Sequence, residues 1–317
     1  MRTTAYAPGS VSNVGPGFDC FGIAVAGRGD RVSVQPSSVR GLRVIGVSDP
    51  RLPGDPKRNT ATLAAAAVLR RAGLDPATLD PGLDFTIDKG LPLAGGLGGS
   101  AASAIAGAVA VDSAMRTHLS REALLEAALE AEAAVSGRHP DNVAPSLYGG
   151  AVVVASIEPL RLVRARVHPS LKIVLVSPAY AVETARARAV LPASVSREDA
   201  VAQAANLAHL IVGLERGDAE LIRGAMHDRI AEPARMALFP GYLEARLAAL
   251  EAGAFGVAVS GAGPTVVAFT GEGAPAVVAG AMLEAYRRRG IEATPYLGGV
   301  DAEGARILGG PGASSRA

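Results

Sequence analysis

A glycine-rich loop that leads directly into an apolar, helix-favouring stretch is the feature that most constrains this chain. The segment PLAGGLGGSAAS, residues 92–103, has glycines at 95, 96, 98 and 99. Glycine lets the backbone approach a ligand closely, and the free N–H groups at a helix start favour a bound anion. Ser100 adds a hydroxyl suited to a phosphate or a metal. The segment predicts a phosphate-binding loop, although a tight turn built for packing uses the same small residues.

The residues in and around the loop decide which known type of phosphate-binding loop it resembles. A Walker A loop needs a lysine next to its last glycine, and no lysine lies in this segment. Gly96-x-Gly98-x-x-Ala101 formally matches a dinucleotide fingerprint, but TIDKGLPLA precedes it where an apolar strand belongs, and Asp112 comes too early to bind a ribose. Dinucleotide binding is therefore the second hypothesis.

Two further glycine clusters occur. SGAGPT, residues 260–265, lies between the apolar runs GVAV and VVAF, so it is a loop between buried strands. Such a loop can contact a phosphate or simply close a hairpin, and the residues alone favour the hairpin. NVGPGFD, residues 13–19, lies near the N-terminus.

Length and composition predict a globular protein of two packed domains. The chain has 317 residues, of which 49% are hydrophobic and 19% charged. A net charge of +1 gives no excess to bind nucleic acid or an anionic membrane. The single cysteine, Cys20, excludes an internal disulfide, and neither an export signal nor an apolar span of about 20 residues is evident. We therefore expect a cytosolic protein.

Helix-favouring and strand-like segments are mixed along the chain. Short β-branched runs such as 152–154, 173–176 and 266–269 predict buried strands. Ser196, three residues before Asp199, is spaced like a helix cap. We place a domain boundary near residue 165, giving domains 1–165 and 166–317, and expect the terminal GGPGASSRA to be a frayed tail. Helices are predicted at 60–72, 100–116, 121–135, 197–215 and 275–289.

The order of the three glycine-bearing motifs resembles that of the GHMP kinases. Within that superfamily, several segments are similar to those of the homoserine kinases, and the match runs nearly end to end. The segments that carry the resemblance are APGSVSNVGPGFDCFGIAV (7–25), HPDNVAPSLYGG (139–150), TARARAVLP (184–192), IAEPARMALFPGY (230–242) and VSGAGPTVVAF (259–269).

The resemblance implies an α+β fold of two domains: an N-terminal GHMP kinase domain with a left-handed βαβ unit and a ferredoxin-like C-terminal domain. ATP and substrate would bind between them. Ser100 and Glu132 correspond to the family's Mg²⁺ ligands, and Asn59 would lie near the nucleotide base. Gly99 departs from the family, which commonly has a serine there. The resemblance therefore does not decide which groups complete the coordination shell of the metal. The ATP-phosphate loop would comprise Pro92, Leu93, Ala94, Gly95, Gly96, Leu97, Gly98, Gly99, Ser100, Ala101 and Ala102.

The resemblance also implies a pocket for a zwitterionic amino acid. Arg188 and Arg235 match the family's carboxylate-binding arginines, and paired guanidinium donors suit a carboxylate. Asp19 would receive the ammonium group. Substrate binding and catalysis would further involve Asn13, His139, Asp141 and Asn142, with His139 and Asn142 orienting the attacking hydroxyl and Asp141 as a possible base.

The expected activity is ATP-dependent phosphorylation of the L-homoserine hydroxyl in threonine biosynthesis, with ATP and Mg²⁺ as cofactors and a homodimer as the assembly. Taken singly, the same residues also suit surface arginines, turn or cap asparagines and a loop histidine. Three alternatives stay open: another GHMP small-molecule kinase, a non-catalytic ligand-binding protein of the same fold, and an NAD-dependent oxidoreductase.

Overall fold

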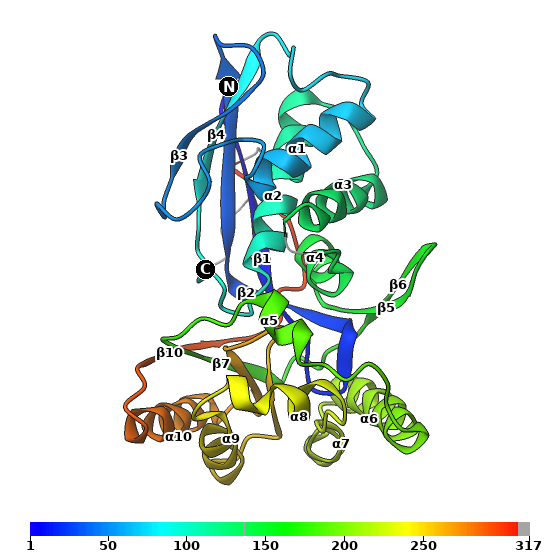
Figure 1. Cartoon of the computed structure of the whole chain (residues 1–317), viewed down its shortest axis with the longest axis vertical. Coiled ribbons are helices and arrows are strands. Elements are labelled where there is room, and N and C mark those ends of the chain that lie inside the picture. Colours follow the sequence, from blue (N-terminus) through cyan, green and yellow to red (C-terminus); the bar gives the residue numbers. More distant parts are fainter. Residues whose placement is uncertain (136, 310–317) are drawn as a thin grey trace.

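A computed structural model describes residues 1–135 and 137–309 and shows two α+β domains, one above the other (Figure 1). The predicted frayed tail lies, from Gly310 on, outside the described residues. The strands of the upper sheet are β1 (Thr3–Asn13), β2 (Gly17–Ser37), β3 (Leu42–Val47), β4 (Gly82–Asp88), β5 (Ala151–Ile157), β6 (Leu160–Ala165) and β11 (Arg306–Leu308). Those of the lower sheet are β7 (Lys172–Pro178), β8 (Gly256–Val259), β9 (Val266–Thr270) and β10 (Ala293–Gly298).

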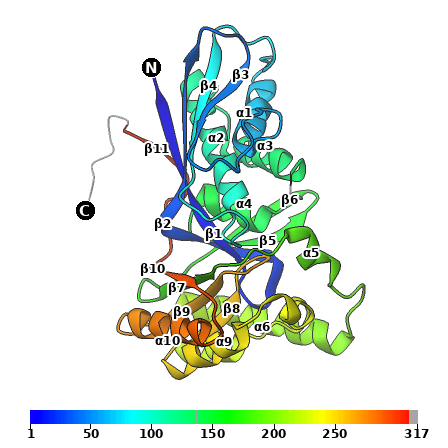
Figure 2. The ribbon, with the colours of Figure 1, turned by 60° about the vertical axis from the view of Figure 1, so that its left-hand side comes forward.

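The upper sheet is organised around the long strand β2, which pairs antiparallel with β1, β4 and β5. Its main path runs β11-β1-β2-β4-β3, and β6 is added through β5. β3 and β4 are parallel neighbours joined through α1, as in a βαβ unit. Four helices cover one face of this sheet (Figure 2). They are α1 (Thr60–Arg71), α2 (Gly99–Met115), α3 (Arg121–Ala133) and α4 (Pro140–Tyr148).

Helix α2 is buried in the upper domain because its residues are small and apolar on nearly every side. It packs against α1, α3 and strand β1, so the glycine-rich loop that precedes it is anchored by the core. A helix that is apolar all round must be buried in this way. The core thus fixes the position of the α2 N-terminus.

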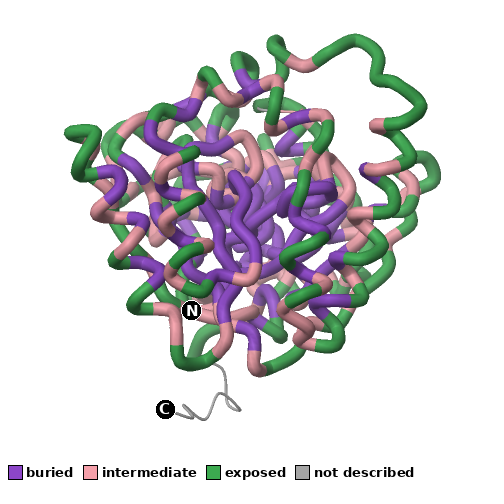
Figure 3. The backbone as a smooth tube through the Cα atoms, turned by 90° about the horizontal axis from the view of Figure 1, so that it is seen from below, coloured by how far each residue is buried: buried purple, intermediate pink, exposed green. Residues whose placement is uncertain are grey.

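The lower sheet has the strand order β10-β7-β9-β8, with every neighbouring pair antiparallel. Seen from below, buried residues gather at the centre of the molecule and exposed ones around its rim (Figure 3). With α10 between β9 and β10 and a helical segment between β7 and β8, this is the predicted ferredoxin-like arrangement. The helices are α5 (Thr184–Ala189), α6 (Arg197–Arg216), α7 (Ala219–Ala225), α8 (Ala231–Arg235), the 3₁₀ turn η1 (Met236–Leu238), α9 (Tyr242–Glu251) and α10 (Pro275–Arg288).

The five predicted helices and three predicted strands are confirmed, with ends that differ by a few residues at most. The side chain of Ser196 caps α6 by accepting a hydrogen bond from the Asp199 amide. The loop 260–265 joins β8 to β9 as a hairpin, as its residues alone favoured.

After β10 the chain returns to the upper sheet, where Val300 bridges Val25 and β11 pairs with β1. The division at residue 165 stays a prediction. In the part of the chain that the structure describes, no helix is both long and apolar enough to span a membrane.

Candidate active site

A cavity of about 280 Å³ lies at the junction of the two domains and is lined by residues from both. The structure brings almost all of the predicted site residues into its wall. Leu97 and Ala102 are the exceptions, since both are buried in the core of the upper domain. The predicted residues that line the cavity are Asn13, Asp19, Asn59, Pro92, Leu93, Ala94, Gly95, Gly96, Gly98, Gly99, Ser100, Ala101, Glu132, His139, Asp141, Asn142, Arg188 and Arg235.

The glycine-rich loop opens helix α2 and presents the amides of its first turn. The first bond of the helix runs from the Ala102 amide to the Gly98 carbonyl, so the amides of residues 99 to 101 have no partner within the helix. Gly98 has φ +59°, and a Cβ there would lie 2.3 Å from Ser10 Oγ. Only glycine fits this position, because any side chain would meet both strain and a clash. The geometry suits an anion at the helix N-terminus.

The hairpin loop between β8 and β9 supports the phosphate loop from the other domain. Ser260 Oγ donates to the Gly96 carbonyl at 2.6 Å, and the Thr265 amide donates to the Gly95 carbonyl at 3.3 Å. Two of the glycine clusters are therefore in direct contact, although their sequence positions gave no sign of it.

Lys89 was missed by the sequence analysis. Its ammonium group forms an ion pair with Asp30 and donates to the Gly99 carbonyl at 2.6 Å and to Ser103 Oγ at 3.1 Å. The side chains of Lys89 and Asp30 are 5% and 0% exposed. A Cβ on Gly99 would lie 3.1 Å from Lys89 Nζ, so the missing serine leaves room for this cation. The only sequence signal that could have identified Lys89 is that lysine is rare in this chain and that this one lies just before the glycine-rich loop.

Ser100 and Glu132 fit a hard cation. Ser100 Oγ is buried and, among the described residues, has no hydrogen-bond partner. The Glu132 side chain, from α3, is 3% exposed and lines the same cavity. Mg²⁺ takes one or two such protein oxygens and completes its shell with phosphate oxygens and water. In the described part of the chain, no three or more His, Cys, Asp or Glu side chains are placed so that they could hold a metal ion together, and this kind of site does not need such a group.

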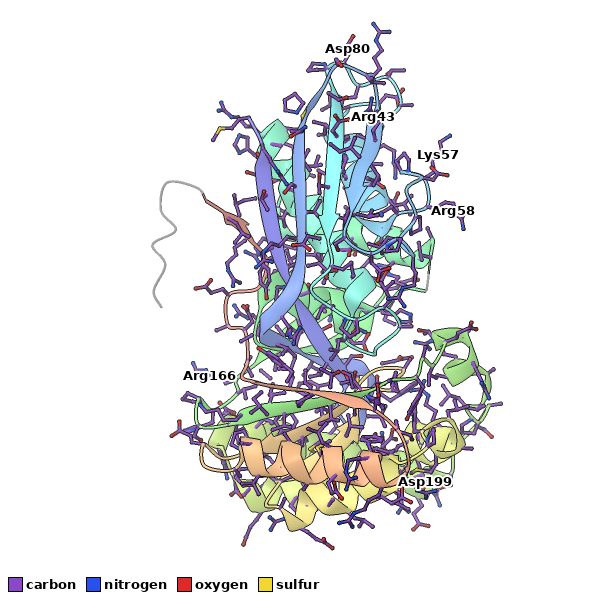
Figure 4. The ribbon with its side chains drawn as sticks, turned by 90° about the vertical axis from the view of Figure 1, so that its left-hand side faces the viewer. Arg43, Lys57, Arg58, Asp80, Arg166 and Asp199 are labelled. Carbon is purple, nitrogen blue, oxygen red and sulfur yellow. The ribbon has the colours of Figure 1, made fainter. Side chains whose placement is uncertain are left out.

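Asn59 caps α1, which gives it a structural role that the resemblance did not suggest. Its Oδ1 accepts from the Ala61 amide at 3.1 Å, and its Nδ2 donates to the Pro53 carbonyl at 3.0 Å. The exposed Arg58 beside it also borders the cavity, and Figure 4 shows it projecting from the loop before α1. A contact between Asn59 and a base stays a prediction.

Arg188 and Asp19 form an ion pair in the wall of the cavity. Two guanidinium nitrogens of Arg188 donate to the two Asp19 oxygens at 3.0 and 2.9 Å, and one of them lies 3.2 Å from His139 Nδ1. Asp19 sits at φ +55°, and its amide donates to Asn13 Oδ1 at 3.0 Å. Arg188, which was predicted to bind the substrate carboxylate, thus pairs with Asp19, which was predicted to bind the substrate ammonium group. Both side chains are about two-fifths exposed, so this bond is weak enough to exchange.

Arg235 is held differently, by backbone carbonyls. Arg235 is only 5% exposed. Its Nε donates to the Ala187 carbonyl at 2.8 Å, and one terminal nitrogen donates to the Gly261 carbonyl at 3.2 Å. The guanidinium group also lies 5.1 Å from the centroid of the Phe18 ring. Within the described residues it makes no ion pair. Burial lowers its pKa while the Asp19 charge raises it, and an arginine stays cationic throughout. A buried cation without an acidic partner is suited to bind a carboxylate.

Asp141 and Asn142 open helix α4 beneath the cavity. In the side chain of Asn142, Oδ1 accepts from Ser10 Oγ and Nδ2 donates to Ser12 Oγ, both at 3.1 Å. Burial first, and then the Asp19 charge, raises the pKa of Asp141 to about 6, while His139 and a hydrogen bond with Ser12 act to lower it. Ser10 and Ser12 were not predicted as site residues. They alternate along β1, and nothing in that pattern distinguishes them from ordinary strand serines.

The matches with known families agree with this geometry. "GHMP kinases N terminal domain" matches residues 59–150 and "GHMP kinases C terminal" matches residues 210–288. The chain is 41% identical to a homoserine kinase of Halorubrum lacusprofundi, over 92% of this chain and 95% of that protein. It is 39% identical to a homoserine kinase of Xylella fastidiosa, over 97% and 94%.

A solved homoserine kinase from Cytophaga hutchinsonii has the same fold. It superposes with a TM-score of 0.91 at 36% identity and covers 97% of both chains. A dinucleotide-binding domain is excluded by the same matches, and residues 89–98 separate β4 from α2 where that fold needs a tight turn. Kinase family matches in both halves, a glycine-rich loop in the cavity at their junction and this extent of identity together place the chain in the homoserine kinase family of the GHMP kinases.

Proposed function

We propose that this chain is an ATP:L-homoserine O-phosphotransferase that makes O-phospho-L-homoserine for threonine biosynthesis. The observation that carries the proposal is a single cavity that joins the α2 N-terminus to Arg235, which is buried and forms no ion pair with any residue that the structure describes. The first feature suits a triphosphate and the second a carboxylate. The names of the relatives support the same acceptor.

Homoserine would bind through both ends of its zwitterion. Its carboxylate takes the free donors of Arg235 and replaces Asp19 as the partner of Arg188. Asp19, once released, accepts the ammonium group. This exchange keeps every charge paired, so binding does not leave a buried charge uncompensated.

ATP would bind with its phosphates at the amides of residues 99 to 101. Ser100 Oγ and Glu132 would hold Mg²⁺, which supplies charge neutralisation on the transferring phosphoryl group when bound. The buried ion pair of Lys89 with Asp30 holds the same helix end in place, because Lys89 also donates to the Gly99 carbonyl. Asn59, Arg58 and the wall near Pro53 would border the base.

Transfer would then depend mainly on alignment. The homoserine hydroxyl oxygen forms the new bond to the γ-phosphorus, the bond to the ADP oxygen breaks, and the hydroxyl proton leaves. Phosphoryl transfer has a loose transition state, so orientation by His139 and Asn142 matters more than a strong base. Asp141, whose pKa is raised to about 6, is mostly ionised at neutral pH and able to take the proton. A homodimer and a cytosolic location stay predictions.

The test is ADP release in a coupled assay with homoserine, mevalonate and galactose as acceptors. We expect turnover with homoserine alone, with a phosphomonoester product visible by phosphorus NMR. Turnover with mevalonate or galactose but not homoserine would move the chain to another GHMP activity. Glu132→Ala should abolish the Mg²⁺-dependent rate, whereas a mere binding protein shows no rate in the wild type.

A further inference from the structure

The acceptor end of the cavity is built by two segments from different domains. Residues 13–19, which comprise the end of β1, the turn 14–16 and the start of β2, provide Asn13 and Asp19, and α8 provides Arg235. Both segments meet at the Gly261 carbonyl, which accepts from Asn13 Nδ2 at 2.9 Å and from Arg235 at 3.2 Å. The spacing between turn and helix therefore decides whether one small zwitterion can reach both.

Helix α8 has only five residues, too few to be stable on its own. It is held at its start by Asp228, whose Oδ1 accepts from the amides of Ile230 and Ala231 at 2.8 and 2.9 Å. Asp228 Oδ2 accepts from the Glu232 amide at 2.9 Å. This carboxylate therefore helps to fix the direction of α8, and with it the position of Arg235 at the end of the helix.

Gln203 of α6 connects that cap to the turn. Its residue is 8% exposed, and its Nε2 donates to the Pro16 carbonyl at 2.9 Å and to Asp228 Oδ1 at 3.1 Å. Its Oε1 accepts from the Arg229 amide at 2.7 Å. One buried amide thus contacts the middle of the β1–β2 turn and the segment that begins α8.

The surrounding contacts do not duplicate this link. Asn206, one turn along α6, donates to the His227 carbonyl at 2.8 Å but does not reach the turn. Asp199, labelled in Figure 4, accepts from Arg229 Nε at 3.1 Å across an exposed ion pair. A small hollow bordered by Asn13, Asp228 and Arg235 separates the cap from the acceptor end.

We propose that Gln203 and Asp228 are positioning residues, which set the distance from Asn13 and Asp19 to Arg235 and so fix the enzyme's fit to its acceptor. The proposal rests on the proposed function for the identity of that acceptor. Neither residue contacts the phosphate loop, so the effect should fall on the acceptor and not on ATP.

The test compares Gln203→Glu with the matched control Asn206→Asp. Glutamate keeps the shape of Gln203 but turns its donor into an acceptor that faces Asp228 Oδ1 and the Pro16 carbonyl. We expect the KM for homoserine to rise about tenfold or more, with the KM for ATP within about twofold, because misplacing a binding group costs on this scale. Asn206→Asp should leave both constants near wild type. Gln203→Glu should melt at a lower temperature than Asn206→Asp, because its carboxylate is buried beside Asp228, and thermal melting must show that both variants are folded at the assay temperature.

Equal changes in both KM values, no change in either, or the same acceptor-specific change in Asn206→Asp would overturn the proposal. If Gln203→Glu does not fold, Asp228→Asn removes one of the cap's acceptors and should give the same split between the two constants. The wild-type assay tests the proposed function separately, and another acceptor would simply replace homoserine in the comparison. A crystal structure of Gln203→Glu needs no acceptor, and there Asn13 or Arg235 should lose its bond to the Gly261 carbonyl.

Discussion

The two arginines of the candidate pocket differ in how their charges are balanced. Arg188 is partly exposed and paired with Asp19, whereas Arg235 is buried and held by neutral carbonyls. An incoming carboxylate adds a full charge pair to Arg235 but only exchanges the partner of Arg188. Arg235 should therefore contribute more to acceptor affinity.

Replacing Arg235 with alanine should raise the KM for homoserine far more than the KM for ATP. A desolvated charged contact contributes about 2 to 4 kcal/mol, or roughly 30-fold to 1,000-fold. Steady-state kinetics with each substrate varied in turn checks this, and Arg287→Ala, at an exposed helix end, is the control. Similar increases for both substrates would contradict this role for Arg235.

Asp141 should make stability depend on pH. Its pKa rises from 3.8 to about 6 in the folded protein, so folding favours the protonated form. The stability that the protonated Asp141 contributes is fully present below about pH 4 and is lost as the pH rises through 6. Above that pH, burying the ionised carboxylate lowers the free energy of unfolding by on the order of 3 kcal/mol.

Asp141→Asn should therefore be more stable than wild type at pH 8 and about equal to it near pH 4. Urea unfolding at the two pH values measures the difference. A variant no more stable than wild type at pH 8 would show that the buried carboxylate is fully compensated.

Among the structural elements, the phosphate loop depends on a buried ion pair that joins β2, the segment after β4 and α2. Lys89 neutralises Asp30 and donates to the Gly99 carbonyl at the start of α2. Lys89→Met should lower the free energy of unfolding by about 3–5 kcal/mol, because it leaves the Asp30 charge buried alone.

Adding Asp30→Asn to Lys89→Met should restore part of that stability, since the uncompensated charge is then gone. Chemical denaturation of both variants at pH 7 gives the comparison. A double variant no more stable than Lys89→Met would mean that the lost contacts to Gly99 and Ser103, not the charge, carry the effect.

The helices, the short buried strands and the glycine-rich turn into α2 could be predicted because their signals are local. Ser196 caps α6 as its spacing to Asp199 indicated, and glycines 95, 96 and 98 precede α2, which begins at Gly99. Contacts between distant residues could not be predicted this way. Gln203 reaches Pro16 across 187 positions, and no periodicity marks such a pair.

At the scale of the molecule, the cavity exists because two domains approach each other at their loops. The pairing of Arg188 with Asp19 follows from that approach and not from either segment, so the sequence predicted both residues but not their bond. Catalysis would then consist of holding two ligands in line within one cavity, which is how phosphoryl transfer is accelerated.

The central claim is that this cavity selects an acceptor by its carboxylate. The most direct measurement is the ratio of kcat/KM for L-homoserine to that for 3-aminopropan-1-ol, which has the same hydroxyl and amine but no carboxylate. With two guanidinium groups left without their partner, we expect a ratio of about 1,000 or more. A ratio below about ten would mean that Arg188 and Arg235 do not bind the acceptor.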